Sequence, residues 1–520
     1  MRDPSPLSWL AAATPVVLLF GLVLLQRVGT HTAALIVAVV AAAIAAGRFE
    51  AGLDVLGPAV GKGAWLGLWI GYVVAPALLL YRLATVAGVD RIRSVVAALG
   101  RTDTERLLVV AWLLPSLIQG IAGFGAPIAL TAPLLLSLGY GTVRAVSYPL
   151  IGYCWSVTFG SMASSFYTAS VTAQLSPAAS GELAVRAAVI LAVLAVACGA
   201  TLCVLHGGPR CLLRTAPFLL VVGVPLGLAL VAVAWLMPAM ATVASAGTGI
   251  AVTAALAAVR RRRERGVPAP DADGGGARLA ALAPYLALVA VALPVFLVPA
   301  SGDWVRGHLL LSLDFPATET GLGWSNPALA GYTPIALLGH PGSYILLACV
   351  VGYLTYRRAG LWGDHRLRDV LLPWVRSLPR AITPIVALTI VAAVLIDSGM
   401  TATVAAGLVG VLGGLYPVAA PAIGAVGSFT TGSTTSSNAL LSSLQAESAT
   451  LLELPPAALL AGQTAGGNVG NAVAPVVVAV GAMAVDATDR VSAILRRTLP
   501  PALVLLALVT VLVVASVRVG

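Results

Sequence analysis

The sequence predicts an all-α polytopic membrane protein with about twelve transmembrane helices in two inverted-topology repeats, each containing a re-entrant hairpin and a broken helix. The first observation is composition: of 520 residues, 59% are hydrophobic and only 10% are charged, and the mean hydropathy is +0.98. A soluble chain carries roughly 25% charged residues. The composition therefore excludes a soluble enzyme, a disordered scaffold and a nucleic-acid-binding protein, and it makes the lipid bilayer the first expected partner.

The second observation is the spacing of the apolar runs, since a helix needs roughly 20 apolar residues to cross a bilayer. Predicted spans lie at 10–25, 32–46, 64–81, 145–166, 186–206, 217–236, 240–259, 280–299, 342–356, 381–396, 455–485 (broken) and 498–518. Two more apolar stretches, 107–140 and 419–445, are interrupted by Gly, Pro, Ser and Thr. They are predicted to be re-entrant hairpins, which are stable at membrane depth only where protein or water surrounds the broken backbone.

The distribution of basic residues predicts the orientation. With the loop 82–106 placed inside, only six of the 30 basic residues fall outside, namely Arg2, Arg48, Lys62, Arg186, Arg306 and Arg518. Cytoplasmic loops of membrane proteins carry the excess of Lys and Arg. Both termini are therefore expected outside.

The third observation is a repeated order of features. The polar, Pro/Gly-rich segment 260–278 predicts a cytoplasmic linker, and it follows a first repeat over 1–210 and two linking helices within 211–259. Displacing the first half by 310 positions, for example Leu130 onto Leu440, places its hairpin on the interrupted stretch of the second repeat, 279–520. Matched crossings then run in opposite directions, which is the signature of an inverted repeat.

Four polar, glycine-rich segments, 119–127, 152–165, 430–438 and 462–471, are the predicted site. A break at membrane depth exposes backbone N–H groups at the start of a half-helix, where the helix dipole favours a carboxylate, and exposed carbonyls can hold sodium. Helix packing through small residues is the alternative explanation. The candidate substrate-binding residues are Gly123, Gly125, Ser433, Thr434, Thr435, Ser436, Ser437, Asn438, Gln463, Thr464, Asn468 and Asn471.

Among the acidic residues, Asp397 alone falls next to an apolar span rather than in a clear loop, so it is a candidate for ion coupling. Its neighbours Ser398 to Met400 suggest a helix end near the outer surface, which favours a solvated or capping carboxylate. No catalytic residues and no metal site are predicted, because the nearest carboxylate pair, Asp271 and Asp273, lies in the linker. No cofactor is expected apart from a transported proton or sodium ion.

Long ordered motifs resemble the L-lactate permease family of bacterial 2-hydroxymonocarboxylate transporters. They are Gly123–Pro127 with Ile128–Thr131, Thr431–Ser433 with Thr435–Leu440, and Thr464 with Gly466, Gly467 and Gly470. The resemblance covers nearly the whole chain. It implies a permease that imports L-lactate or glycolate across the bacterial plasma membrane by proton symport, with Ser436, Ser437 and Asn438 on the substrate carboxylate. It also implies a possible homodimer with an elevator-like motion.

The chain departs from the family pattern at three positions. Gln119, Thr434 and Asn471 stand where the family has Glu, Asp and Lys, which makes Gln119 the second coupling candidate. A Gln cannot carry a proton near neutral pH. The alternatives are therefore transport of a different small metabolite, sodium-coupled or uncoupled transport, and, in another class, a membrane sensor or partner protein that binds without flux.

Overall fold

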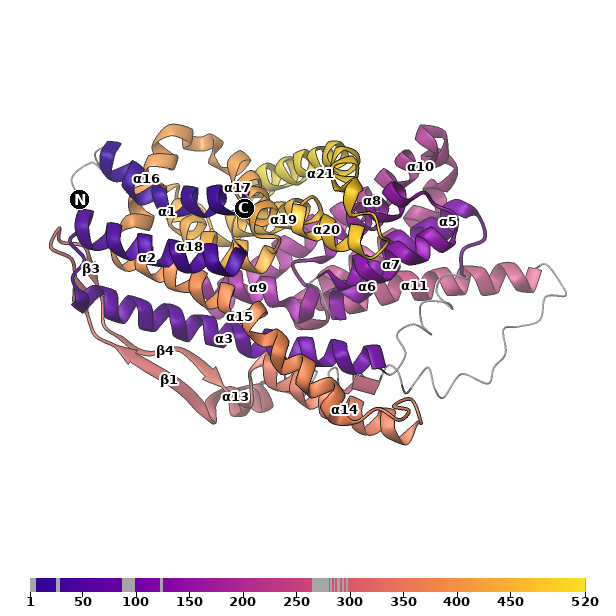
Figure 1. The fold of residues 1–520 in the computed structure, drawn as a ribbon, viewed down its shortest axis with the longest axis horizontal. Helices are drawn as coiled ribbons and strands as arrows, with labels where there is room; N and C mark the ends of the chain where they lie inside the picture. The colour runs from indigo at the N-terminus through magenta and orange to yellow at the C-terminus, as the bar shows by residue number, and fades with distance from the viewer. Residues whose placement is uncertain are drawn as a thin grey trace.

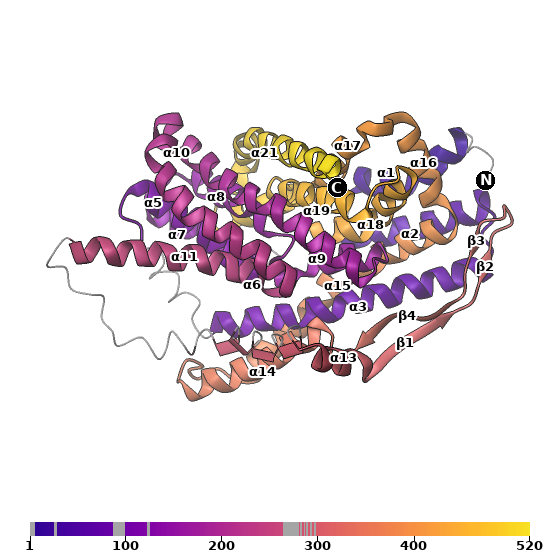
Figure 2. The same ribbon diagram turned by 180° about the vertical axis from the view of Figure 1, so that it is seen from behind.

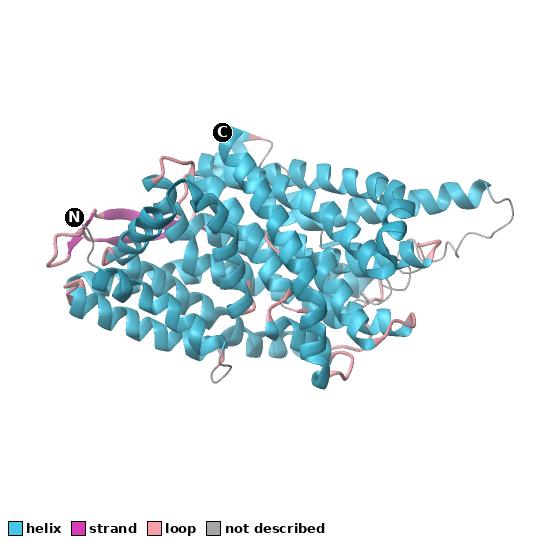
Figure 3. Ribbon diagram, turned by 90° about the horizontal axis from the view of Figure 1, so that it is seen from above, coloured by secondary structure: helices cyan, strands magenta, loops and turns pink. Residues whose placement is uncertain are grey.

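The computed structural model describes residues 6–24, 29–86, 99–121, 125–263 and 298–519, with a few positions between 280 and 295. Helices make up almost all of it, as the cyan ribbon of Figure 3 shows. Nine helices in this described part are long and apolar enough to cross a membrane. The predicted all-α membrane fold is confirmed, while the number of about twelve crossings stays a prediction.

The first half of the chain contains a hairpin and a broken helix. Its helices are α1 (Pro6–Leu24), α2 (Thr30–Arg48), α3 (Leu53–Val86), α5 (Asp103–Leu108), a π-helical turn (Val109–Leu113), α6 (Leu114–Ile121), α7 (Ala126–Ser137), α8 (Thr142–Tyr153), α9 (Gly160–Thr172), α10 (Pro177–Leu236) and α11 (Pro238–Arg263). The predicted spans 186–206 and 217–236 both lie in α10, which kinks where Gly208 adopts φ 73°.

The predicted span 145–166 is interrupted. The helix α8 ends at Tyr153, a 3₁₀ turn covers Cys154–Ser156, and α9 begins at Gly160. Three consecutive non-glycine residues then adopt left-handed backbone angles, which an uninterrupted α-helix cannot contain. This segment is therefore a broken helix, as 455–485 is.

The second half adds a β-hairpin that the sequence analysis did not predict. Its elements are α13 (Pro299–Gly307), β1 (Leu310–Phe315), β2 (Thr318–Glu319), β3 (Ser325–Asn326), β4 (Leu329–Ala336), α14 (Pro341–Arg358), α15 (Leu367–Asp397), α16 (Met400–Leu412), α17 (Tyr416–Thr431), α18 (Thr434–Leu451), α19 (Pro456–Ala472), α20 (Pro475–Met483) and α21 (Val491–Val519). Strands β1 and β4 pair antiparallel with Leu310 opposite Ala336. In Figure 1 this ribbon runs along α3 at the edge of the molecule. The predicted span 280–299 and most of the linker lie outside the described residues.

One pair of helix ends in the two halves follows the 310-residue displacement. The helices α2 and α14 end at Arg48 and Arg358. The order of hairpin, broken helix and long helix is the same in both halves. The opposite orientation of the halves, and with it the assignment of 1–210 and 279–520 as repeats, stays a prediction.

Helices α3 and α15 pack extensively on each other and lie across one another in Figures 1 and 2. A Cβ added at Gly63 would overlap the backbone of Ile390, and one at Gly67 would lie 2.6 Å from Val386 Cα. Glycine at these two positions lets the backbones approach directly. On the outside, apolar side chains such as Val39 and Leu228 are exposed, as the hydrocarbon core of a bilayer requires.

The second hairpin packs on its broken helix in the same way. A methyl group at Gly466 would overlap the carbonyl oxygen of Pro421, and one at Gly470 would overlap that of Ala425. The tight contact between α17 and α19 therefore depends on glycine at both positions. It holds the hairpin tip beside the break between α19 and α20.

Candidate functional site

A cavity of about 280 Å³ lies where the tips of both hairpins meet both broken helices. The hairpins contribute Gln119, Gly125, Thr431, Gly432, Ser433, Thr434, Thr435 and Ser436; the broken helices contribute Tyr153, Val157, Ser161, Ser164, Ser165, Asn471, Val476, Val477 and Val480; and α15 contributes Arg380, Ala381, Pro384 and Ile385. Segments from distant parts of the chain thus form one wall. Hydroxyl and amide side chains face the cavity together with apolar side chains.

The starts of four half-helices border this cavity. Gly125 is the N-cap of α7, with φ 83°, and Ser433 is the N-cap of α18. Ser164 lies where α9 becomes regular, and Val476 lies in the first turn of α20. The first amides of a helix have no intrahelical partner and sit at the positive end of the dipole. The four starts together create a positive potential suited to an anion.

The tip of the second hairpin is held by its own side chains. Gly432 ends α17 in a left-handed conformation, with φ 69°. Ser433 Oγ accepts from the amide of Ser436 at 3.2 Å, and Thr431 Oγ1 accepts from the amide of Ser433 at 3.3 Å. The amides of Thr434 and Thr435, at the first two positions of α18, are the ones that such a helix start offers to a ligand.

The break in the first broken helix stores backbone strain next to the cavity. Ser161, Met162 and Ala163 have φ of 47°, 55° and 60°, a region that costs a non-glycine residue on the order of 1–3 kcal/mol. The Phe166 amide reaches back over the break to the Thr158 carbonyl at 3.1 Å. Ser164 and Ser165 are thereby turned toward Thr435, whose hydroxyl lies 2.9 Å from that of Ser165.

Five of the predicted substrate-binding residues, Ser437, Asn438, Gln463, Thr464 and Asn468, do not line the cavity. They form a buried network behind it. Asn438 Nδ2 donates to the Ser165 carbonyl at 2.9 Å and to Thr464 Oγ1 at 3.0 Å, and Gln463 Nε2 donates to Asn438 Oδ1 at 3.2 Å. Ser437 Oγ donates to the Gly424 carbonyl. These side chains hold the hairpin tip against both broken helices.

The other predicted residues do meet at the cavity. Gly125, the run Ser433 to Ser436, and Asn471 all line it, and so does the coupling candidate Gln119; Gly123 lies outside the described residues. The three positions at which the chain departs from the family pattern, Gln119, Thr434 and Asn471, therefore lie around one space. A set of ionisable groups at these positions would lie close enough to compensate one another.

Two contributions to the wall of the cavity were not predicted from the sequence. Ser161, Ser164 and Ser165 were inside a predicted polar segment, and their clustering was the available signal. Arg380 is the one charged side chain among the described lining residues. It was counted only as a marker of the cytoplasmic side, because it stands immediately before an apolar span.

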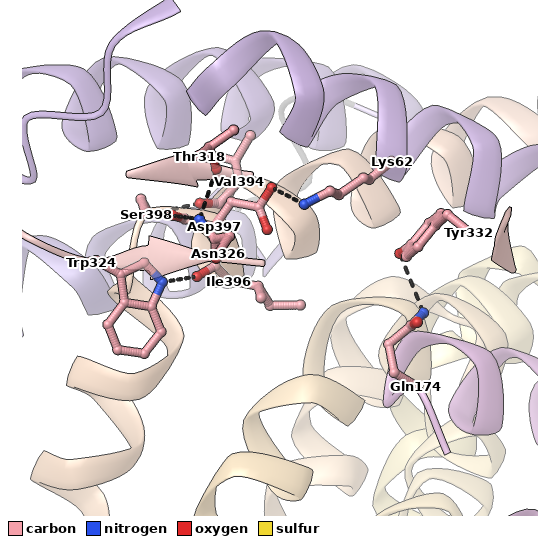
Figure 4. Close-up of polar contacts among 10 residues, drawn as sticks. All are labelled: Lys62, Gln174, Thr318, Trp324, Asn326, Tyr332, Val394, Ile396, Asp397 and Ser398. Atoms are coloured by element: carbon pink, nitrogen blue, oxygen red, sulfur yellow. Dashed lines mark hydrogen bonds and ion pairs between the residues drawn. The ribbon is translucent and has the colours of Figure 1, made fainter. Parts of the chain in front are cut away.

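The other coupling candidate, Asp397, lies away from the cavity. It ends α15, and its carboxylate accepts from Lys62 Nζ at 2.9 Å, with the two side chains only 6% and 5% exposed (Figure 4). The expectation of a solvated or capping carboxylate is therefore wrong, because Lys62, on α3, is buried beside it.

The β-hairpin closes over this ion pair. Asn326 Nδ2 donates to the Asp397 carbonyl at 2.9 Å, and Trp324 Nε1 donates to the Ile396 carbonyl at 3.0 Å (Figure 4). The ring of Phe315 lies 5.9 Å from Lys62 Nζ. Only the tertiary structure brings these strands to the end of α15.

Apolar helices, paired hairpins and a cavity lined by helix starts define a polytopic membrane transporter. A family model described as L-lactate permease matches residues 8–520, and the chain belongs to this family. It is a multi-pass membrane permease and not an enzyme.

Two curated relatives match over almost the whole chain. The glycolate permease GlcA of Escherichia coli K12 is 27% identical over 535 residues, covering 96% of this chain and 93% of the relative. The L-lactate permease of Bacillus subtilis is 28% identical over 555 residues, covering 97% and 95%. Among solved structures, the YdaH transporter of Alcanivorax borkumensis matches with a TM-score of 0.46 and 15% identity over 86% of this chain and 85% of that one.

Proposed function

We propose that this permease carries L-lactate or a similar small monocarboxylate such as glycolate across the plasma membrane by ion symport. The observation that supports this most is the cavity of about 280 Å³, at which four helix starts converge and whose described lining contains no carboxylate side chain. A small anion gains from the helix dipoles and from hydrogen bonds to hydroxyl groups, without having to displace an internal anion. The names of the relatives agree with this substrate class.

In this proposal the substrate carboxylate lies at the start of α18. Its hydrogen-bond donors are the backbone amides of Thr434 and Thr435 and the hydroxyl of Ser436. The side-chain amide of Asn471 and the hydroxyls opposite the hairpin tip lie in the same wall. Four residues, Asn438, Gln463, Thr464 and Asn468, act as positioning residues, because each side chain forms at least one hydrogen bond in the network behind the cavity. A substrate hydroxyl next to the carboxylate finds donors and acceptors among the same side chains.

The coupling ion is the second part of the proposal. Gln119 lines the cavity but cannot carry a proton near neutral pH, and Asp397 is paired with Lys62. Sodium held by carbonyl and hydroxyl oxygens is therefore the alternative to a proton. Carbonyl oxygens at the broken segments supply ligands of this kind.

The test is uptake of labelled L-lactate and glycolate by the purified protein in liposomes, under an inward proton gradient, an inward sodium gradient or neither. Accumulation above the equilibrium level identifies the coupling ion, and equilibration alone means uncoupled transport. Absence of flux for both substrates contradicts the proposed substrate class. Binding without flux would instead favour the sensor hypothesis.

A further inference from the structure

The charge of the cavity comes from a single side chain. Arg380 is the only charged residue among the described residues that line it. Arg380 also lines a second pocket of about 300 Å³, whose other residues are Arg82, Pro373, Arg376 and Ser377. The two spaces share this one side chain, so three arginines, of which Arg376 and Arg380 are exposed, line two adjoining spaces.

Among the residues that the structure describes, no carboxylate neutralises these arginines. Within the part of the chain that the structure describes, none of Arg82, Arg376 and Arg380 forms an ion pair, whereas Arg186 and Arg260 do. Arg376 and Arg380 are four residues apart on α15 and so lie on one face, where like charges repel. An unfavourable arrangement of this kind creates a positive potential at the mouth of the cavity.

The chemistry of this mouth fits a carboxylate of single charge. A guanidinium binds a carboxylate through two parallel N–H···O bonds, which a lysine cannot reproduce. The helix starts add partial positive charge but only Arg380 adds a full one. A neutral metabolite of the same shape gains less from this residue, because its oxygen atoms carry no full charge.

We propose that Arg380 selects the charge of the substrate: its guanidinium pairs with the substrate carboxylate at the mouth of the cavity, and Arg82 and Arg376 attract anions toward it. This inference rests on the proposed transport of a monocarboxylate. The positive-inside distribution assigns all three arginines to the cytoplasmic side, so this is the inner mouth. Release and rebinding of substrate at that face depend on Arg380.

The experiment measures equilibrium binding of labelled L-lactate to the purified full-length protein in detergent. We expect Arg380→Gln to weaken binding about 10- to 100-fold, the range of a lost charge-assisted hydrogen-bonded contact, and Arg380→Lys to retain part of it. Arg368→Gln is the matched control, because Arg368 is on the same helix, is 73% exposed and lines neither space. The control should bind within about twofold of the original protein, since a loosely paired surface charge contributes little.

A neutral competitor separates charge selection from general damage to the site. Lactamide has the shape of lactate but no charge, so its inhibition constant should change far less than the dissociation constant of lactate between the original protein and Arg380→Gln. Equal lactate affinity in both proteins would overturn the inference while leaving monocarboxylate transport intact. If the original protein binds neither lactate nor glycolate, the proposed function fails first.

A separate measurement tests whether Arg82 and Arg376 attract the substrate. Electrostatic attraction acts on the association rate and is screened at high ionic strength. The double variant Arg82→Gln/Arg376→Gln should bind lactate more slowly than the original protein at low salt and equally fast at high salt. An unchanged association rate at low salt would remove both residues from the proposal.

Discussion

Thr158 and Asn468 connect the two halves of the protein directly behind the cavity. Thr158 Oγ1 donates to Asn468 Oδ1 at 2.9 Å, and the two residues are 310 positions apart. Both are fully buried, and Asn468 Nδ2 donates in turn to the Trp155 carbonyl at 3.1 Å. Residues that correspond under the displacement found in the sequence thus hydrogen-bond to each other, which holds the two broken helices in a defined relation.

Replacing Thr158 by Val should destabilise the protein by about 1–3 kcal/mol, because Asn468 Oδ1 loses its donor in a buried environment. The measurement is the melting temperature of the purified protein in detergent. The matched control is Thr498→Val, since Thr498 is equally buried but donates only within its own helix, to the Ile494 and Leu495 carbonyls. A larger effect of the control would contradict a special role for the contact between the halves.

Two neighbouring serines at the second hairpin should differ in function. Ser436 lines the cavity, whereas Ser437 Oγ donates to the Gly424 carbonyl at 3.2 Å behind it. Ser436→Ala should weaken L-lactate binding roughly 10- to 100-fold, as expected for one hydrogen bond to a charged carboxylate, and Ser437→Ala should leave the affinity unchanged in folded protein. Equal affinity in the two variants would place the carboxylate elsewhere.

Introducing a carboxyl at Gln119 should make transport depend on pH. The new group in Gln119→Glu is charged above its pKa and repels an anionic substrate in the same cavity, so KM for lactate should rise as pH rises and fall as the group protonates. The original protein carries a neutral amide there and should show a flatter profile. Parallel profiles for the two proteins between pH 5 and 8 would show that residue 119 does not face the substrate.

Breaking the ion pair between Lys62 and Asp397 should destabilise the protein strongly. Asp397→Asn leaves a buried ammonium without its carboxylate, a change that costs on the order of 3–5 kcal/mol. The double variant Lys62→Met/Asp397→Leu removes both charges and should restore most of the melting temperature. Glu182→Gln, which breaks a partly exposed pair with Arg186, is the control nearer the surface and should cost no more than about 1 kcal/mol.

The same double variant tests whether Asp397 carries the coupling ion. Asp397 lies roughly 18 Å along α15 from Ile385, the nearest residue of that helix that lines the cavity, since a helix rises about 1.5 Å per residue. We therefore expect gradient-driven accumulation of L-lactate to persist in the double variant. Loss of accumulation with retained equilibration would instead identify Asp397 as the coupling group.

The membrane class, most of the apolar spans and the two hairpins follow from the sequence, because hydropathy and interrupting Gly, Pro and Ser are local properties of the chain. The four polar segments also locate the site, and Gly125, Ser433 to Ser436 and Asn471 do line the cavity. The apolar periodicity of the chain did not predict the hairpin of β1 and β4. Its two strands are held by pairing with one another, and nothing in their local sequence marks where that hairpin packs.

Only the tertiary structure decides which residues of the polar segments line the cavity and which lie behind it. Ser436 and Ser437 are adjacent and chemically identical, yet helical geometry turns one to the cavity and the other to Gly424. Arg380 is a site residue only because α15 passes the hairpin tips. Lys62 pairs with Asp397, which is 335 positions away in the chain. A sequence records which groups are available along the chain; the distance between groups on separate helices is set by how those helices pack.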